Sequence, residues 1–139
     1  MSEEERKVQS LLAEFRLLEN RMNEANSQRE ILTRAFLDAR AGVVTLKELD
    51  TSSTSEVLIP LGGGVFVNGK TPPVDKLLVA IGADVVVEKS IDEALKYLEE
   101  RVKGMENAVV GLDAQRNDIN NKIIEKRESI NNIMAKQQG

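Results

Sequence analysis

One stretch of the chain carries residues in a spacing known from phosphate chemistry. Residues 64–71 read GVFVNGKT, which matches the phosphate-binding pattern G-x-x-x-x-G-K-[ST]. A phosphate loop must follow a strand and deliver its Lys and Thr to the first turn of a helix, whose amides then hold the phosphate. Here residues 65–67 are themselves strand-forming, and the two prolines directly after Thr71 offer no amide donors. The hypothesis that the chain is an NTPase therefore rests on this match alone, and we expect no nucleotide site.

The composition removes most other catalytic chemistry. The 139 residues contain no His and no Cys, so zinc sites, thiolate nucleophiles and disulfides are excluded. Paired carboxylates such as Glu99 and Glu100 fall on charged helical faces that solvent is expected to cover. We expect no catalytic, cofactor or metal site.

The net charge of −4 with interspersed signs argues against a nucleic-acid or membrane surface. The acidic start MSEEE is unlike a signal peptide, and we therefore expect a soluble intracellular protein.

Both flanks of the chain repeat apolar residues at alternating spacings of three and four, which is the heptad pattern of a coiled-coil helix. Ser2 with Glu5, and Ser90 with Glu93, predict capping boxes at the two helix starts. Gly42 lies inside the first series, where we allow a bend. The first series is Val8, Leu11, Phe15, Leu18, Met22, Ala25, Arg29, Leu32, Phe36, Ala39, Val43 and Leu46. The second is Ile91, Leu95, Leu98, Val102, Met105, Val109, Leu112, Arg116, Ile119, Ile123, Lys126, Ile130 and Ile133.

The two helices have matched lengths, which suggests that they pair with each other. Because the chain must reverse between them, we expect an antiparallel coiled-coil hairpin within a single domain of residues 1–139. Its parts are helix one over 2–49, a β segment over 50–89 and helix two over 90–137. Arg29, Arg116 and Lys126 interrupt the series, and we expect them to fix the helix register or to extend toward solvent.

The middle of the chain is rich in valine and poor in charge, which is typical of strands. We predict four strands, over 56–61, 64–68, 76–81 and 84–89, with turns at Gly62-Gly63 and Gly82-Ala83 and a link at residues 71–73. Several strands are apolar on both faces, so two isolated hairpins would expose apolar faces and open edges to water. The β segment is therefore interpreted as an assembly module that needs strands from other chains. The residues expected to carry assembly are Val57, Ile59, Val65, Val67, Val79, Ile81, Val85 and Val87.

Some apolar residues of the helices are not required by the seam. Leu12, Leu17, Ile124 and Met134 lie toward the end of the coil that holds both termini. Single exposed apolar residues are ordinary on protein surfaces, and that reading stays open. Alternatively, they form an adaptable apolar patch with seam residues near the end of the helices, where the seam is incompletely covered.

The sequences EVLIPLGGGVFV at residues 56–67 and VVVEKS at 85–90, placed between coiled-coil helices, resemble the archaeal prefoldin alpha subunit. The architecture of two helices joined by two β-hairpins is also similar to that family. The resemblance implies an α+β fold: a long antiparallel coiled-coil hairpin whose β-hairpins assemble into an intersubunit β-barrel.

The resemblance implies an ATP-independent chaperone of the cytoplasm, a holdase that binds non-native proteins at the coiled-coil tips and delivers them to a chaperonin. Its implied partners are prefoldin beta subunits, two alpha with four beta. The residues expected to bind clients at the tips are Val8, Leu11, Leu12, Phe15, Ile130, Ile133 and Met134. The alternative is a passive coiled-coil scaffold or tether without client binding.

Overall fold

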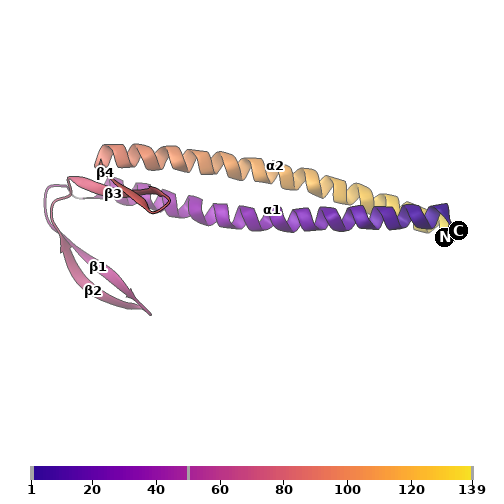
Figure 1. Ribbon diagram of the computed structural model, residues 1–139, viewed down its shortest axis with the longest axis horizontal. Coiled ribbons are helices and arrows are strands. Elements are labelled where there is room, and N and C mark those ends of the chain that lie inside the picture. Colours follow the sequence, from indigo (N-terminus) through magenta and orange to yellow (C-terminus); the bar gives the residue numbers. More distant parts are fainter. Residues whose placement is uncertain (1, 50, 139) are drawn as a thin grey trace. The chain divides into compact units, whose positions relative to one another are not determined.

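The computed structural model describes residues 2–49 and 51–138, so Asp50, where the predicted β segment begins, lies outside the described residues. The elements follow the order α1 (Glu3–Glu48), β1 (Ser55–Gly62), β2 (Val65–Thr71), β3 (Lys76–Gly82), β4 (Val85–Ser90) and α2 (Ile91–Gln138) (Figure 1). The chain divides into two compact units. We call the first, residues 2–36 with 104–138, the helical unit, and the second, Leu37–Lys103, the hairpin unit.

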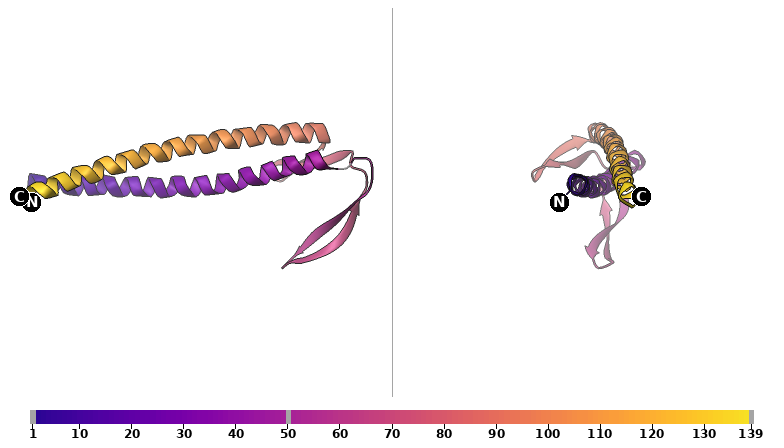
Figure 2. Two further views of the ribbon diagram at one scale, coloured as in Figure 1. Left: turned by 180° about the vertical axis from the view of Figure 1, so that it is seen from behind. Right: turned by 90° about the vertical axis from the view of Figure 1, so that its right-hand side faces the viewer.

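In the helical unit α1 and α2 run side by side, and both chain ends lie at the same end of the pair (Figures 1 and 2). Leu18, Ala25, Ile119 and Ile130 are the buried apolar residues of this unit. All other seam residues in this unit are half-buried, whereas most of their neighbours are exposed. The alternation of three and four residues therefore places one stripe of each helix against the other, and the predicted antiparallel helix pair is confirmed.

Both helices begin at the serines expected to cap them. The Ser2 hydroxyl accepts a hydrogen bond from the Glu5 amide at 3.2 Å, and the Ser90 hydroxyl accepts one from the Glu93 amide, also at 3.2 Å. These bonds satisfy amides that have no partner within the helix. Acidic residues fill the first turn of both helices, where they complement the positive end of the helix dipole.

The hairpin unit contains the end of α1, the start of α2 and all four strands. Ala39 and Ala94 are its buried apolar residues. α1 continues through Gly42, and a Cβ atom added there would lie 3.2 Å from Leu98 Cδ1 of α2. Glycine at this position therefore permits a close approach of the two helices, which offsets its low helix propensity.

The strands form two separate antiparallel hairpins, β1 with β2 and β3 with β4 (Figure 1). Three strands lie within about two residues of their predicted bounds. The prediction was wrong for β2, which runs to Thr71 instead of ending at Asn68, because Lys70 and Thr71 pair with Glu56 and Ser55 of β1. Pro72 and Pro73, which were expected to link the two hairpins, follow directly after the last residue of β2, Thr71.

The second hairpin repeats the first with an offset of 20 residues. Ile59 pairs with Val67 and Val79 with Val87, while the closing pairs are Gly62 with Val65 and Gly82 with Val85. Both ladders also shift register at the same place, between residues 60 and 62 and between residues 80 and 82. The chain thus contains one hairpin design twice, a repeat that sequence analysis missed because only a few side chains are identical.

The turns lie one residue later than predicted. Because Gly62 pairs with Val65 and Gly82 with Val85, the central turn residues are 63–64 and 83–84, not 62–63 and 82–83. All four central residues have positive φ, including Ala83 at 50° and Asp84 at 60°. This is the geometry of the tight turns whose twist matches that of paired strands.

The repeat predicts which turn glycines are replaceable. Gly62 has a φ of 113°, outside the region that L-residues adopt, whereas Gly63 at 59° corresponds to Ala83, which already carries a side chain at 50°. Gly62→Ala should therefore destabilise the protein by about 1–3 kcal/mol, and Gly63→Ala by less than about 1 kcal/mol. Urea unfolding of both variants measures the difference. Equal losses from the two substitutions would contradict this account of the turn.

Candidate functional site

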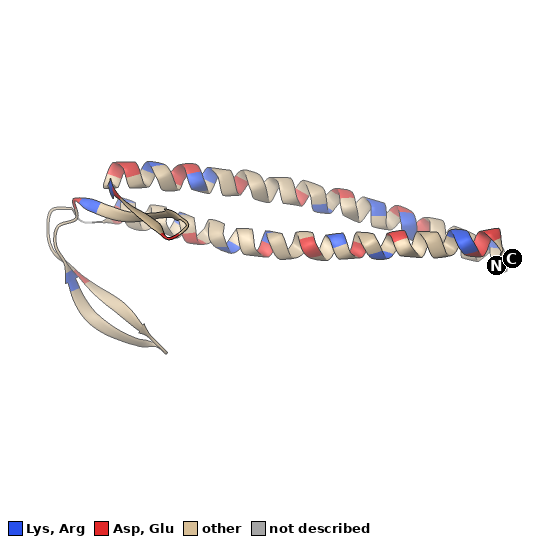
Figure 3. Cartoon of the chain, viewed as in Figure 1, with Lys and Arg blue, Asp and Glu red and all other residues tan. Residues whose placement is uncertain are grey.

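Charged side chains are distributed unevenly between helices and hairpins. Figure 3 shows both signs spread along α1 and α2, while the hairpins are largely uncharged. Within the described residues, no group of three or more carboxylates is close enough to hold a metal ion, and no helix is long and apolar enough to cross a membrane. Two surfaces are therefore the candidates for a functional site: the polar and apolar surface of the helix pair, and the exposed faces of the hairpins.

The phosphate-loop pattern lies in a hairpin. Gly69, Lys70 and Thr71 are strand residues of β2 and pair with Val57, Glu56 and Ser55 of β1. The next helix, α2, begins only at Ile91. The Lys and Thr are therefore held in a ladder and do not open a helix, so the backbone nest that would bind phosphate is not formed by these residues.

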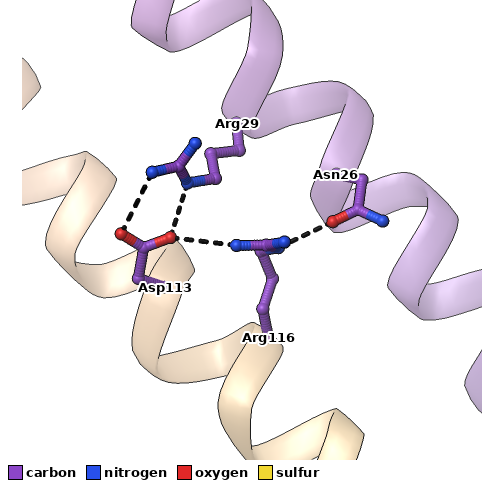
Figure 4. Close-up of polar contacts among 4 residues, drawn as sticks. All are labelled: Asn26, Arg29, Asp113 and Arg116. Carbon is purple, nitrogen blue, oxygen red and sulfur yellow. Dashed lines mark hydrogen bonds and ion pairs between the residues drawn. The ribbon is translucent and has the colours of Figure 1, made fainter.

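A cluster of four polar residues crosses the seam of the helical unit (Figure 4). Arg29 of α1 donates two hydrogen bonds to Asp113 of α2, from Nε to Oδ1 at 2.5 Å and from Nη2 to Oδ2 at 3.4 Å. Arg116 donates from Nη1 to Asp113 Oδ1 at 3.2 Å and from Nε to Asn26 Oδ1 of α1 at 2.6 Å. Each arginine therefore bonds the opposite helix, which fixes how the two helices align.

The third charged seam residue is paired in the same way. Lys126 of α2 lies 2.6 Å from Glu14 of α1, measured from Nζ to Oε2. All three seam cations thus have a polar partner on the other helix, as expected for residues that set register. Fixing register is the better supported of the two expected roles, although the side chains of this cluster remain partly exposed.

The cluster shifts two ionisation equilibria. The hydrogen bonds from Arg29 lower the pKa of Asp113, an effect that partial burial opposes and that the charges of Arg29 and Arg116 reinforce. The bond to Asp113 in turn raises the pKa of Arg29. Because the pKa of Asp113 is lower in the folded state than in the unfolded chain, the carboxylate stabilises the fold above the unfolded pKa, and this contribution is lost as the pH falls.

This linkage predicts a pH-dependent stability difference. Asp113→Asn should lower the melting temperature at pH 7, because it removes the carboxylate that both arginines bond. The difference from wild type should narrow below about pH 4, where the unfolded-state carboxyl begins to bind protons. Thermal unfolding monitored by circular dichroism from pH 7 to pH 3 measures it, with exposed Glu125→Gln as the control. A difference independent of pH would mean that Asp113 acts by packing and not by charge.

The seven predicted tip residues differ in accessibility. Leu12 and Met134 are exposed, at 40% and 48%. Val8, Leu11, Phe15 and Ile133 are half-buried, and Ile130 is buried at 8%. The structure thus brings the set to one end of the helix pair but presents only part of it to solvent. Ile130 belongs to the seam and is accessible only where the helices separate.

One half-buried tip residue, Phe15, contacts a cationic side chain. The guanidinium of Arg127 lies 5.7 Å from the centre of the Phe15 ring, within range of a cation–π contact.

Leu17 and Ile124 are also exposed, as their positions outside the seam suggested. Sequence analysis missed four further exposed residues, Ile31, Leu37, Val44 and Val110. Their positions outside the heptad series were the signal that could have found them.

The hairpins expose most of the predicted assembly residues. Val57, Ile59, Val65, Val67, Ile81 and Val85 are 36–57% exposed, while Val79 and Val87 are half-buried. The register places Ile59 and Val67 on one face of the first hairpin, and Val79 and Val87 on the equivalent face of the second.

The opposite face of each hairpin is also apolar. Leu58 and Phe66 on the first hairpin are 65% and 55% exposed, and Leu78 and Val86 on the second are 77% and 55% exposed. The list of assembly residues omitted this face, although the lack of a polar side was visible in the sequence. Two-stranded sheets exposed on both faces are marginal in water, so this surface needs a cover.

Comparison with known protein families gives the class of the chain. The model of the family described as Prefoldin subunit matches residues 5–138, and the chain therefore belongs to the prefoldin family. This confirms the resemblance found in the sequence and ties the chain to a chaperone role of the prefoldin type.

Individual relatives identify the subunit type that the chain is similar to. Prefoldin subunit alpha of Nitrosopumilus maritimus is 29% identical over 99% of this chain and 94% of its own length. Prefoldin subunit alpha of Methanospirillum hungatei is 31% identical over 91% of this chain and 92% of its own length. Similarity to alpha subunits thus extends over the helices as well as the hairpins.

Two solved structures share the fold. Filamentous PFD from Methanocaldococcus jannaschii, solved by cryo-EM, is 26% identical, with a TM-score of 0.66 over 79% of this chain and 92% of the other. The prefoldin beta subunit from Thermococcus strain KS-1, a crystal structure, is 16% identical, with a TM-score of 0.62 over 89% of both chains. At 16% identity the second likeness concerns the fold alone, and it confirms two long helices joined by β-hairpins as a prefoldin architecture.

Proposed function

We propose that this chain is an alpha-type subunit of a prefoldin chaperone that holds non-native proteins without nucleotide. The observation that carries this proposal is the exposure of Leu12 and Met134 beside half-buried apolar residues, at the end of the helix pair where both termini lie. Unfolded proteins expose apolar side chains, and an apolar patch that can be widened by fraying of the last turns is suited to bind them.

Each single side-chain contact between such a patch and a client contributes little binding free energy. A partly covered Leu or Met side chain contributes about 1–2 kcal/mol of apolar burial. Tight holding therefore requires several helix pairs to engage one client at once, because linked weak sites gain affinity through effective concentration. Assembly of several chains is then part of the mechanism, and the energy of holding comes from burial and not from ATP.

The hairpins are proposed to supply that assembly. Their exposed apolar faces and open edges would be covered by hairpins of other subunits, closing an intersubunit β-barrel. By resemblance to alpha subunits, the proposed partners are prefoldin beta subunits, four with two alpha chains, and the complex would act in the cytoplasm and pass clients to a chaperonin.

A passive scaffold is the second candidate, favoured by one observation. Ile130 is only 8% exposed, and Lys126 and Glu14 pair across the helices nearby, so part of the tip is closed. If the helix ends do not open, the exposed tip surface is limited to a few side chains. Client binding by the tips distinguishes the two candidates.

Removing the tips should abolish chaperone activity but not assembly. Deletion of residues 1–12 together with 128–139 takes a similar length from both helices and leaves the hairpin unit complete. We expect the truncated chain, co-expressed with a beta subunit, to reach the oligomeric state of the full chain but to lose suppression of the aggregation of a chemically unfolded protein. Undiminished protection would place the client surface elsewhere.

Point variants test the same surface without shortening the helices. Leu12→Ser and Met134→Ser together should weaken client affinity about tenfold or more, which corresponds to the loss of one or two partly buried side chains. The matched control is Ile31→Ser with Val110→Ser, which changes two exposed apolar side chains of the same helices away from the chain ends. Equal losses in both pairs would favour a diffuse apolar effect over a tip site.

A charge on the apolar face of the first hairpin should disrupt assembly. Val67→Asp places a carboxylate on the face shared with Ile59, where a covering subunit would bury it without a partner. Val110→Asp introduces the same charge at an exposed apolar residue of α2, away from both hairpins, and serves as the control. Native mass spectrometry with a co-expressed beta subunit should show small species for Val67→Asp only. Intact assembly of that variant would exclude this face from the interface.

A further inference from the structure

One cation of the helical unit lies over an aromatic ring and has no ion-pair partner among the described residues. It is Arg127 of α2, whose guanidinium is 5.7 Å from the centre of the Phe15 ring. The neighbouring Lys126, in contrast, is paired with Glu14. The residues three and four positions from Arg127 on its own helix are three isoleucines and one asparagine, so α2 offers it no carboxylate at the spacings that pair side chains.

Arg127 shares one face of α2 with an exposed tip residue. Arg127 and Met134 each follow a seam residue directly, and they are seven residues apart, so the heptad repeat places both on the same side of the helix. Leu12 has the equivalent place in α1, directly after the seam residue Leu11. Met134 is 48% exposed and Leu12 is 40% exposed.

The polar cluster shows that these faces of α1 and α2 adjoin. Arg116 bonds both Asn26 of α1 and Asp113 of α2, so these two residues lie on one side of the helix pair (Figure 4). Asn26 lies two heptads after Leu12, and Asp113 lies two heptads before Arg127. Leu12 and Arg127 therefore lie on the same side of the pair as the cluster does, but closer to the chain ends.

The alignment of the helices gives the spacing of the apolar and cationic contacts. Phe15 lies beside Arg127 and the helices are antiparallel, so Leu12 lies at a level between Arg127 and Met134. Arg127 and Met134 are about 10 Å apart along the helix axis, at about 1.5 Å per residue. An extended polypeptide advances about 3.3 Å per residue, so about three of its residues cover this distance.

A carboxylate is the group that complements Arg127. The Phe15 ring covers one face of the guanidinium without neutralising its charge, and a carboxylate can accept two N–H bonds from a guanidinium. Three carboxylates, Glu3, Glu4 and Glu5, occupy the first turn of α1, nearer to the chain end than Leu12 is. They repel an acidic group at the very end of the helix pair, which leaves Arg127 as the favourable position.

We propose that Leu12, Met134 and Arg127 form one composite client site, which selects apolar segments of non-native proteins that carry a carboxylate about three residues away. The apolar side chain of the client packs on Leu12 and Met134, and its carboxylate pairs with Arg127. This proposal rests on the proposed function as a holdase and deepens it by naming the class of segment that is held.

The test compares labelled peptides in their binding to the full chain assembled with a beta subunit, measured by fluorescence anisotropy. Each peptide carries several leucine segments joined by Gly and Ser, so that several tips engage it at once. In the first peptide Glu stands three residues from each segment on both sides, and in the second Gln replaces every Glu. A third peptide has the composition of the first, with all glutamates gathered at one end.

Wild type should bind the first peptide about threefold or more tightly than the second, because exposed ion pairs contribute modestly and several are formed. The third peptide should lose this advantage, since its net charge is the same but its carboxylates do not reach Arg127. Arg127→Gln should bring the affinity ratio of the first two peptides close to one. The ratio is the readout because Arg127→Gln also uncovers Phe15, which changes the binding of both peptides alike.

Lys136→Gln is the matched control. Lys136 is an exposed cation in the last turn of the same helix, and it does not directly follow a seam residue. Its substitution removes the same charge from the same end of the molecule, and the affinity ratio should stay at the wild-type value. Added salt should reduce the ratio in wild type and in Lys136→Gln.

Four results would overturn the composite site. They are equal affinity of wild type for the first two peptides, equal affinity for the first and third, an unchanged ratio in Arg127→Gln, or the same loss of the ratio in Lys136→Gln. Each of them leaves the proposed holdase function in place, provided that the Gln peptide binds. Binding of neither peptide by wild type would overturn both proposals.

Discussion

The seam between α1 and α2 is the constraint on which the rest of the molecule depends. A strict alternation of three and four residues keeps one stripe of each helix facing the other, and full burial of a side chain such as Leu18 or Ile119 contributes about 1.5–3 kcal/mol. Buried alanines and Gly42 allow the helices to approach closely. Because the seam uses most of the large apolar residues of the helices, the few that lie outside it become the candidates for binding.

The polar cluster and the hairpins determine two properties that the seam alone does not: the alignment of the helices and the apolar surface that stays exposed. An apolar seam would tolerate several alignments of the helices, whereas the bonds of Arg29 and Arg116 to the opposite helix favour one. The hairpins, in contrast, leave apolar faces and strand edges open within a single chain. Helix pairing is therefore completed inside the chain, whereas the apolar faces of the hairpins stay exposed, which is why other chains are proposed to cover them.

Sequence analysis predicted the helices, their caps and the seam correctly because heptad spacing is a local and redundant signal. It misplaced the end of β2 and both turns, since strand ends depend on pairing that a local pattern does not show, as with Lys70 opposite Glu56. The partners of the seam cations also could not be predicted, because they depend on the relative alignment of the two helices. Of the tip residues, exposure of Leu12 and Met134 follows from their place outside the seam, whereas the burial of Ile130 follows from its place within it.

Site-specific photo-crosslinking tests the central claim, that the ends of the helices hold non-native proteins, most directly. A photoreactive residue at position 12 or 134 of the assembled protein is irradiated in the presence of a chemically unfolded client and, separately, of the same client in its native state. The account predicts crosslinks to the unfolded client from both positions, few to the native client, and few from the same residue placed at position 31 or 110. Equal crosslinking from all four positions, or none from positions 12 and 134, would contradict it.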